Sequence, residues 1–210
     1  MWEALGQTTV AAAGVPTINT ATRVAMVGDS LTYGSLPFQP DAFLDVGWAD
    51  SSIDAFGSRG ILTKIGADPH DGLKAVDAIR SVGGDSDLWV VALGTNDSGI
   101  YSSPHYESVI SQMLHRIGSQ HHVMWVNIFL PKLPQRQAAW NMALDQVSVE
   151  RAGQMYVYDW ASLVAQNPKW MAGDGVHNST LGYQERANAI AQASRNLDAF
   201  LAMRARMRFF

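Results

Sequence analysis

Short apolar runs alternate with segments of helical spacing along the chain from residue 23 onward. The clearest run is LWVVAL at residues 88–93, which is uninterrupted and β-branched, as expected of a strand buried on both faces of a parallel sheet. Four other runs predict strands: residues 23–27, 52–56, 122–130 and 155–159. Residues 71–82 instead place their apolar side chains at helical spacing, which predicts a helix with Asp71 as its N-cap.

Three further segments are patterned as helices: residues 106–117, 135–152 and 181–206. Strands that alternate with helices form βαβ units, in which helices cover both faces of a parallel sheet. The pattern therefore predicts a three-layer α/β/α sandwich around a central parallel sheet of five strands. The chain contains no internal repeat and no low-complexity tract.

Composition narrows the class of protein. The 210 residues correspond to about one domain, and 47% hydrophobic residues are enough for a folded core. The 15 basic and 19 acidic residues give a net charge of −4, which argues against a surface that binds nucleic acid. The absence of cysteine excludes disulfides, thiolate metal sites and a cysteine nucleophile. No apolar run approaches the roughly 18 residues that span a bilayer.

The two ends differ from the body of the chain. Residues 1–22 contain no Lys or Arg, so they lack the basic start of a secretory signal. Their Thr, Ala, Gly and Val residues predict a leading arm or linker. We expect this start to be the cut end of an excised domain or a mature form. The folded domain is expected at residues 23–203, followed by a basic C-terminal tail at residues 204–210.

Polar residues gather in three turns. GDSLTYG at residues 28–34 follows the first strand, GTND at residues 94–97 follows the third, and DGVH at residues 174–177 precedes the last helix. Together they supply a hydroxyl, an amide and a carboxylate–imidazole pair, which are the groups that acyl transfer through a serine requires. Each turn alone has an ordinary explanation as a turn or helix cap. Their joint placement in one α/β chain, where ligands bind at strand ends, favours catalysis.

With these motifs the chain resembles the SGNH hydrolase superfamily, also called the GDSL family. The family has four sequence blocks: a Gly-Asp-Ser, a Gly after the second strand, a Gly-x-Asn-Asp and an Asp-x-x-His. All four occur here in that order, and the match extends from residue 23 to about residue 195. The resemblance implies a flavodoxin-like fold. A looser resemblance, to the SGNH domains of cell-envelope sugar O-acetyltransferases and acetylesterases, is carried by WVN at residues 125–127, Asn141, YDW at residues 158–160 and PKW at residues 168–170.

The resemblance implies a catalytic triad. Ser30 would be the nucleophile, His177 the base that takes its proton, and Asp174 the carboxylate that fixes the imidazole tautomer. These roles imply a serine esterase that needs neither a metal nor an organic cofactor. Short acyl esters, acetyl first, are the expected substrates, because the sequence shows no long apolar lid segment and the envelope-like resemblance points to O-acetylated carbohydrate. The alternatives are an O-acetyltransferase that passes the acyl group to a sugar hydroxyl, and a non-catalytic carbohydrate-binding module. The expected partner is a small-molecule or carbohydrate ester, and the envelope-like resemblance favours a secreted or cell-envelope location.

The same resemblance places the oxyanion hole at the amides of Ser30 and Gly57 and at the side-chain nitrogen of Asn96. The second block departs from the family pattern of Asp-Ala, two variable residues and Gly-Arg. Here it reads DAFGSRG, with Gly one place early and Ser before the Arg. Gly57 is therefore the first choice for the second donor, and Ser58 and Gly60 remain alternatives.

Other residues invite a functional interpretation with less support. Arg59 could clamp a substrate anion, but a solvated or ion-paired surface group is the favoured interpretation. His121 and His122 are adjacent on a predicted strand and would point to opposite faces, so they form no chelate. The tryptophans are expected in the core, although Trp160 and Trp170 flank the catalytic loop and could shape an acyl or sugar pocket.

Overall fold

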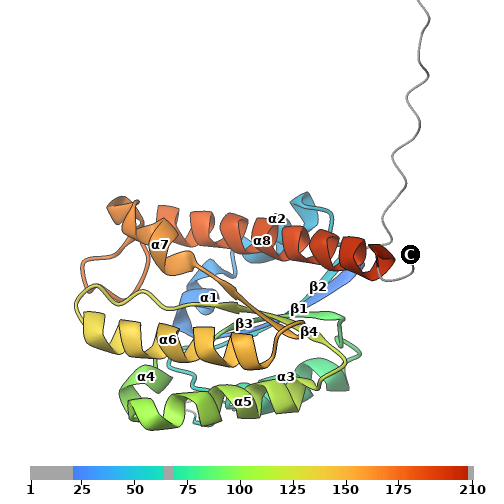
Figure 1. Ribbon diagram of the computed structural model, residues 1–210. Coiled ribbons are helices and arrows are strands. Elements are labelled where there is room, and N and C mark those ends of the chain that lie inside the picture. Colours follow the sequence, from blue (N-terminus) through green and yellow to red (C-terminus); the bar gives the residue numbers. More distant parts are fainter. Residues whose placement is uncertain (1–20, 64–68, 208–210) are drawn as a thin grey trace, which may run out of the picture.

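The computed structural model describes residues 21–63 and 69–207, and Figure 1 shows a central sheet between two layers of helices. Within this part of the chain the sheet has five parallel strands in the order β2-β1-β3-β4-β5. The strands are β1 (Arg23–Gly28), β2 (Asp50–Ala55), β3 (Leu88–Ala92), β4 (His122–Val126) and β5 (Met155–Tyr158). The predicted three-layer, flavodoxin-like fold is confirmed.

Helices cover both faces of the sheet (Figure 1). One layer contains α3 (Gly72–Ser81), α4 (Asp97–Ile100), α5 (Tyr106–Ile117) and α6 (Pro134–Glu150). The opposite layer contains α1 (Ser30–Ser35), α2 (Gln39–Asp45), α7 (Trp160–Ala165) and α8 (Thr180–Met207). Two short 3₁₀ helices are also present: η1 (Ser103–His105) directly precedes α5, and η2 (Pro168–Trp170) lies between α7 and α8.

The core is divided in two by the sheet, because alternate side chains of a strand point to opposite faces. In β1, Ala25 and Val27 pack into the α3–α5–α6 side, whereas Val24 and Met26 pack into the α8 side. Strand β3 is buried at every position, as its uninterrupted apolar run predicted. Since all strands are parallel, the turns that follow β1 and β3 lie at the same edge of the sheet.

Strand β4 is shorter than its apolar run suggested, since it ends at Val126 rather than at residue 130. The Asn127 amide still donates to the Tyr158 carbonyl of β5 at 3.1 Å, and from Ile128 onward the chain is held by α6. The Asn141 side chain accepts from the Ile128 amide at 3.1 Å and donates to the Ile128 carbonyl at 2.9 Å. The run stays apolar past the strand because Ile128 and Leu130 are buried in the core on the α6 side.

The observed ends of two helices can be compared with those predicted from the sequence. The side chain of Asp71 caps α3 by accepting from the Lys74 amide at 2.8 Å, as expected. Helix α8 continues to Met207, so the first residues of the predicted basic tail are helical. Residues 1–20 of the expected arm and residues 208–210 lie outside the described residues. In the described ranges, no helix combines the length and the hydropathy that crossing a membrane requires.

Candidate active site

Ser30 is the first residue of α1 and follows β1 after a single residue, Asp29. The Asp29 side chain caps the helix by accepting a hydrogen bond from the Leu31 amide at 3.0 Å. Gly28 permits this sharp passage from strand to helix, because a Cβ there would lie 2.1 Å from Thr32 Oγ1. The Ser30 amide is among the first helical N–H groups, which have no acceptor within their own helix. The turn thus presents a hydroxyl and an available N–H from one residue.

Asp174 and His177 lie on a tight hairpin between η2 and α8. Met171 and Asn178 pair as an antiparallel bridge at its base, and the Ala172 amide donates to the His177 carbonyl at 2.8 Å. The side chains of both predicted catalytic residues are partly exposed, 50% for Asp174 and 42% for His177. The hairpin therefore holds an imidazole at a surface that a bulky ester can reach.

Ser30, His177 and Asp174 form a continuous chain of hydrogen bonds. His177 Nε2 lies 3.1 Å from Ser30 Oγ, and His177 Nδ1 lies 2.7 Å from Asp174 Oδ2. Hydrogen bonds from the Val176 amide and from the side chain and amide of His177 hold the pKa of Asp174 well below its usual range. An ionised carboxylate only accepts hydrogen bonds, so the proton belongs on Nδ1. Nε2 is then free to accept the proton of the Ser30 hydroxyl.

The second predicted block lies beside Asn96, at the end of β3. One N–H of the Asn96 side chain donates to the Arg59 carbonyl at 2.9 Å, which leaves its second N–H for another acceptor. The Gly60 amide already donates to the Thr63 carbonyl at 2.9 Å. Among the three alternatives of the sequence analysis, Gly57 and Ser58 therefore remain as donors for an oxyanion. Ser58 adopts φ of 60°, a left-handed conformation that favours glycine.

The interpretation of Arg59 as a solvated surface group is wrong. Its side chain is only 1% exposed, and its guanidinium pairs with the Asp54 carboxylate at 2.8 Å and donates to the Asp54 carbonyl at 2.9 Å. A buried Arg tied to its own loop shapes the turn that carries Gly57 and Ser58. The favoured ion pair is present, and it is internal.

A buried cation behind the nucleophile was missed by the sequence analysis. Arg186 of α8 is 2% exposed, and its Nη1 donates to Thr32 Oγ1 at 3.4 Å. Burial lowers the pKa of Arg186 to about 10, while the Asp29 carboxylate opposes that shift. Burial likewise raises the pKa of Asp29, and Arg186 is the largest influence in the opposite direction. The sequence signal was the four-residue spacing from Gly182 to Arg186 to Ile190, which places the Arg on the buried face of the helix.

Asp97 ties the second block to the end of β3. Its side chain is buried and accepts from the Ile61 amide at 2.8 Å. Burial is the main reason that the pKa of Asp97 rises from 3.8 to about 7, and the nearby Asp29 carboxylate adds to the rise. Asp97 therefore supports the geometry of the turn and lies too deep to contact a substrate.

We expect the pH dependence of folding to report on Asp97. Because its folded pKa is raised, its contribution to stability is complete below about pH 4 and is lost as pH rises through about 7. Over that interval Asp97→Asn should remove a slope of about 1.4 kcal/mol per pH unit from the unfolding free energy. Denaturant titrations at several pH values measure it. Equal slopes in the wild type and Asp97→Asn would contradict this role, and Asp145→Asn, an exposed carboxyl on α6, is the control.

The two adjacent histidines have structural partners. The His121 and His122 rings bond separately to the carbonyls of Ser86 and Gly153, at 2.8 and 2.9 Å. In the described part of the chain, no group of three or more His, Cys, Asp or Glu side chains could hold a metal ion. Trp160 is buried, as expected, whereas Trp170 is partly exposed and stacks on it.

Comparisons with known proteins concern the family and the fold. A family model described as "GDSL-like Lipase/Acylhydrolase family" matches residues 26–185. A comparison with curated protein sequences gave no match.

Several solved structures share the fold. The C-terminal catalytic domain of Streptococcus pneumoniae peptidoglycan O-acetyltransferase A, solved with a methylsulfonyl adduct, is 18% identical with a TM-score of 0.59; the alignment covers 83% of this chain and 93% of that one. Est24, a carbohydrate acetylesterase from Sinorhizobium meliloti, is 15% identical with a TM-score of 0.64, covering 84% and 99%. TesA is 16% identical with a TM-score of 0.65, covering 82% and 97%. At these identities the likeness establishes the fold.

Proposed function

The chain belongs to the GDSL-like lipase/acylhydrolase family, whose members hydrolyse esters, and on this premise we propose that it is a serine esterase that removes short acyl groups, acetyl first, from carbohydrate. The observation that carries the proposal is the chain of hydrogen bonds from Ser30 Oγ through His177 to Asp174, at 3.1 and 2.7 Å. A hydroxyl, an imidazole and a carboxylate in this order activate a serine for attack on an acyl carbon.

In the acylation step, Ser30 Oγ attacks the ester carbonyl while His177 Nε2 takes its proton. The negative charge that develops on the carbonyl oxygen would be held by the amides of Ser30 and Gly57, with Ser58 as the alternative to Gly57, and by the free N–H of Asn96. His177 then gives the proton to the departing alkoxide. The product alcohol leaves, and the acyl group remains on Ser30 Oγ.

In the second step, water takes the place of the alcohol. His177 Nε2 removes a proton from water as its oxygen attacks the acyl-enzyme, and returns a proton to Ser30 Oγ when the carboxylic acid departs. A sugar hydroxyl in the place of water would give an acetyltransferase by the same steps. The exposure of His177 and Asp174, 42% and 50%, supports a substrate bulkier than its acyl group and leaves the site open to water.

Two structural relatives support the choice of acetyl and carbohydrate. One is a carbohydrate acetylesterase and another is a peptidoglycan O-acetyltransferase. Their chemistry differs only in the acceptor of the acyl group, which is why the proposal keeps the transferase as its second candidate.

Asn96→Ala should lower kcat by about 10² to 10³ with little change in KM, since a preorganised donor stabilises the oxyanion more than the ground-state carbonyl. Loss of the hydrogen bond to the Arg59 carbonyl should lower Tm as well. The matched control is Asn141→Ala, which removes an amide that bonds the Ile128 backbone, and should lower Tm alone. A kcat within a few-fold of wild type for Asn96→Ala would reduce Asn96 to a residue that only closes its turn.

The proposed function is tested with p-nitrophenyl esters from acetyl to dodecanoyl, assayed with and without an oligosaccharide acceptor. Release of p-nitrophenol that is fastest with the acetyl ester, and that leaves free acetate, is the expected result. Acetylated oligosaccharide as the main product would make the protein an acetyltransferase. If no ester is turned over, the esterase proposal is wrong and the interpretation as a non-catalytic carbohydrate-binding module takes its place.

A further inference from the structure

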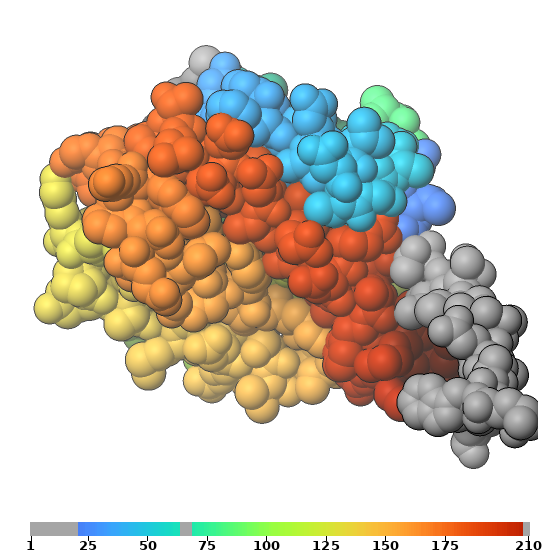
Figure 2. Space-filling model, turned by 90° about the horizontal axis from the view of Figure 1, so that it is seen from above, coloured from blue at the N-terminus to red at the C-terminus, as the bar shows by residue number. Residues whose placement is uncertain are grey.

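A groove of about 500 Å³ lies among α2, α7, η2 and α8, on the helical face that Figure 2 views from above. Its lining includes apolar and polar side chains from all four elements: Asp45, Leu163, Trp170, Glu185, Asn188 and Gln192. None of the triad or oxyanion residues lines it. Its volume falls in the range of roughly 300–1,000 Å³ that is typical of small-molecule sites.

One wall of the groove is an indole. The Trp170 ring stacks on Trp160 with ring centroids 5.9 Å apart and planes inclined by 6°. Trp160 is 2% exposed and belongs to the core, so Trp170 covers it from outside and lines the groove beside Leu163. An indole in this position offers a flat apolar surface with a negative face, on which polarised C–H groups pack favourably.

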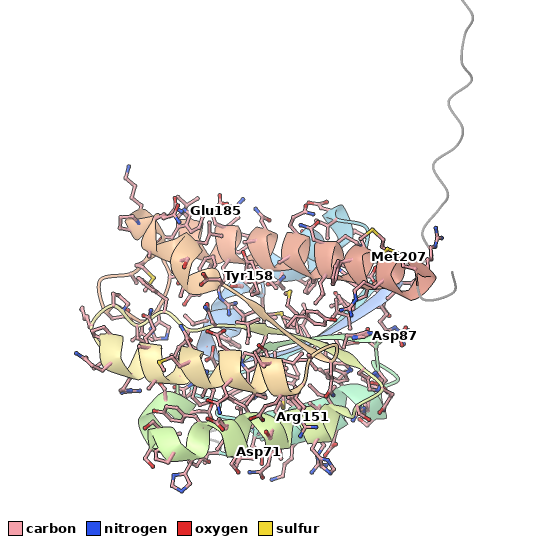
Figure 3. All side chains as sticks on the ribbon, in the orientation of Figure 1. Asp71, Asp87, Arg151, Tyr158, Glu185 and Met207 are labelled. Atoms are coloured by element: carbon pink, nitrogen blue, oxygen red, sulfur yellow. The ribbon has the colours of Figure 1, made fainter. Side chains whose placement is uncertain are left out.

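The opposite wall is polar. Glu185, Asn188 and Gln192 are three and four residues apart on α8 and therefore lie on one side of the helix, and Figure 3 shows Glu185 on its outer side. Asp45 comes from the end of α2. In the described part of the chain, the side chains of Asp45, Glu185 and Asn188 make no hydrogen bond or ion pair. No Lys or Arg is among the described residues that line the groove, and this lining disfavours phosphates and other anions.

The backbone that carries both walls is held by contacts within the protein. The Trp170 carbonyl accepts from the Ser179 amide at 2.8 Å, and a Cβ on Gly182 would lie only 1.9 Å from that carbonyl oxygen. Across the groove, the Arg195 guanidinium donates to the Val46 carbonyl at 3.2 Å and ties the end of α2 to α8. The backbone of the groove therefore loses little conformational entropy when a ligand binds.

We propose that this groove is a second binding site, for a neutral, hydroxyl-rich ligand such as an oligosaccharide segment. The C–H face of a pyranose ring would pack on Trp170, and vicinal hydroxyls would donate to the carboxylates of Asp45 and Glu185 and exchange hydrogen bonds with the amide of Asn188. This site goes beyond the proposed function and does not depend on Ser30 being a nucleophile.

The test is isothermal titration of the Ser30→Ala protein with three probes: cellotetraose, xylotetraose and tetra-N-acetylchitotetraose. At least one probe should bind. Trp170→Ala and Glu185→Gln should each raise the Kd of that probe by about tenfold or more, as expected for loss of a stacking surface or of a charged hydrogen bond. Asn188→Ala, at an exposed helical position, serves if Trp170→Ala fails to fold. Phe200→Ala, an exposed aromatic farther along α8, and Glu150→Gln, on α6, are the matched controls and should bind like the parent.

Two results would overturn the proposal: no heat of binding with any of the three probes, or a Kd that neither Glu185→Gln nor Asn188→Ala changes. The second result would place the sugar elsewhere on the protein. Hydrolysis of p-nitrophenyl acetate by the wild-type preparation, measured in parallel, tests the esterase separately, so the two proposals can fail independently.

Discussion

Ser30→Ala should lower kcat for p-nitrophenyl acetate by a factor on the order of 10⁶ and leave the fold intact. The expected loss is this large because Ser30 Oγ is the only atom that we propose to form the acyl-enzyme, and its hydroxyl lies 3.1 Å from the base that activates it. Ser30 is not the cap of α1, since Asp29 accepts the capping hydrogen bond from the Leu31 amide. Removing the hydroxyl should therefore change Tm by little.

The matched control is Ser148→Ala, which removes a hydroxyl from the exposed side of α6, where it donates to the Asp145 carbonyl at 2.7 Å. It should retain the wild-type kcat. An Ser30→Ala protein that keeps more than about 1% of wild-type kcat, with circular dichroism unchanged, would remove Ser30 from the mechanism.

His177→Ala should cost nearly as much as the loss of Ser30, because no other base lies within hydrogen-bond distance of Ser30 Oγ among the described residues. Asp174→Asn should cost less, up to about 10⁴ in kcat. An Asn oxygen can keep the amide bonds of Val176 and His177, but its NH₂ would then face Nδ1 and impose the tautomer whose Nε2 carries a proton. That tautomer cannot accept the proton of the serine.

Steady-state kinetics of both variants beside His115→Ala, an exposed histidine on α5, measure these effects. The control should behave as wild type. A kcat of Asp174→Asn close to that of the wild type would contradict the role of Asp174 in fixing the tautomer. A small effect of His177→Ala would contradict the mechanism.

The sequence predicted the sheet well because buried strands carry a strong signal. The run at residues 88–93 became β3, and the helix expected at residues 106–117 became α5. The short helices were missed, since α1, α2, α4 and α7 have only six, seven, four and six residues, too few for a periodic pattern. The end of β4 was misplaced because Ile128 is buried by tertiary contacts with α6, which a local pattern does not distinguish from a strand.

In the candidate site, too, some residues could be predicted from the sequence and others could not. Motifs pointed to Ser30, Asp174 and His177, and the fold places His177 within hydrogen-bond distance of each of the other two. The supporting charges were harder to find, because the placement of Arg186 next to Asp29 depends on how α8 packs against α1. Arg59 was misjudged for a related reason: nothing in DAFGSRG indicates that the guanidinium turns inward to Asp54.

The central claim is that Ser30 carries the acyl group, and peptide mapping after reaction with phenylmethylsulfonyl fluoride tests it most directly. The sulfonyl fluoride should modify one residue per chain, and mass spectrometry should place that adduct on the peptide containing Ser30, with simultaneous loss of p-nitrophenyl acetate hydrolysis. His177→Ala should greatly slow the labelling, since the base that activates the hydroxyl is gone. An adduct on any other residue, or full esterase activity in protein labelled at Ser30, would contradict the account.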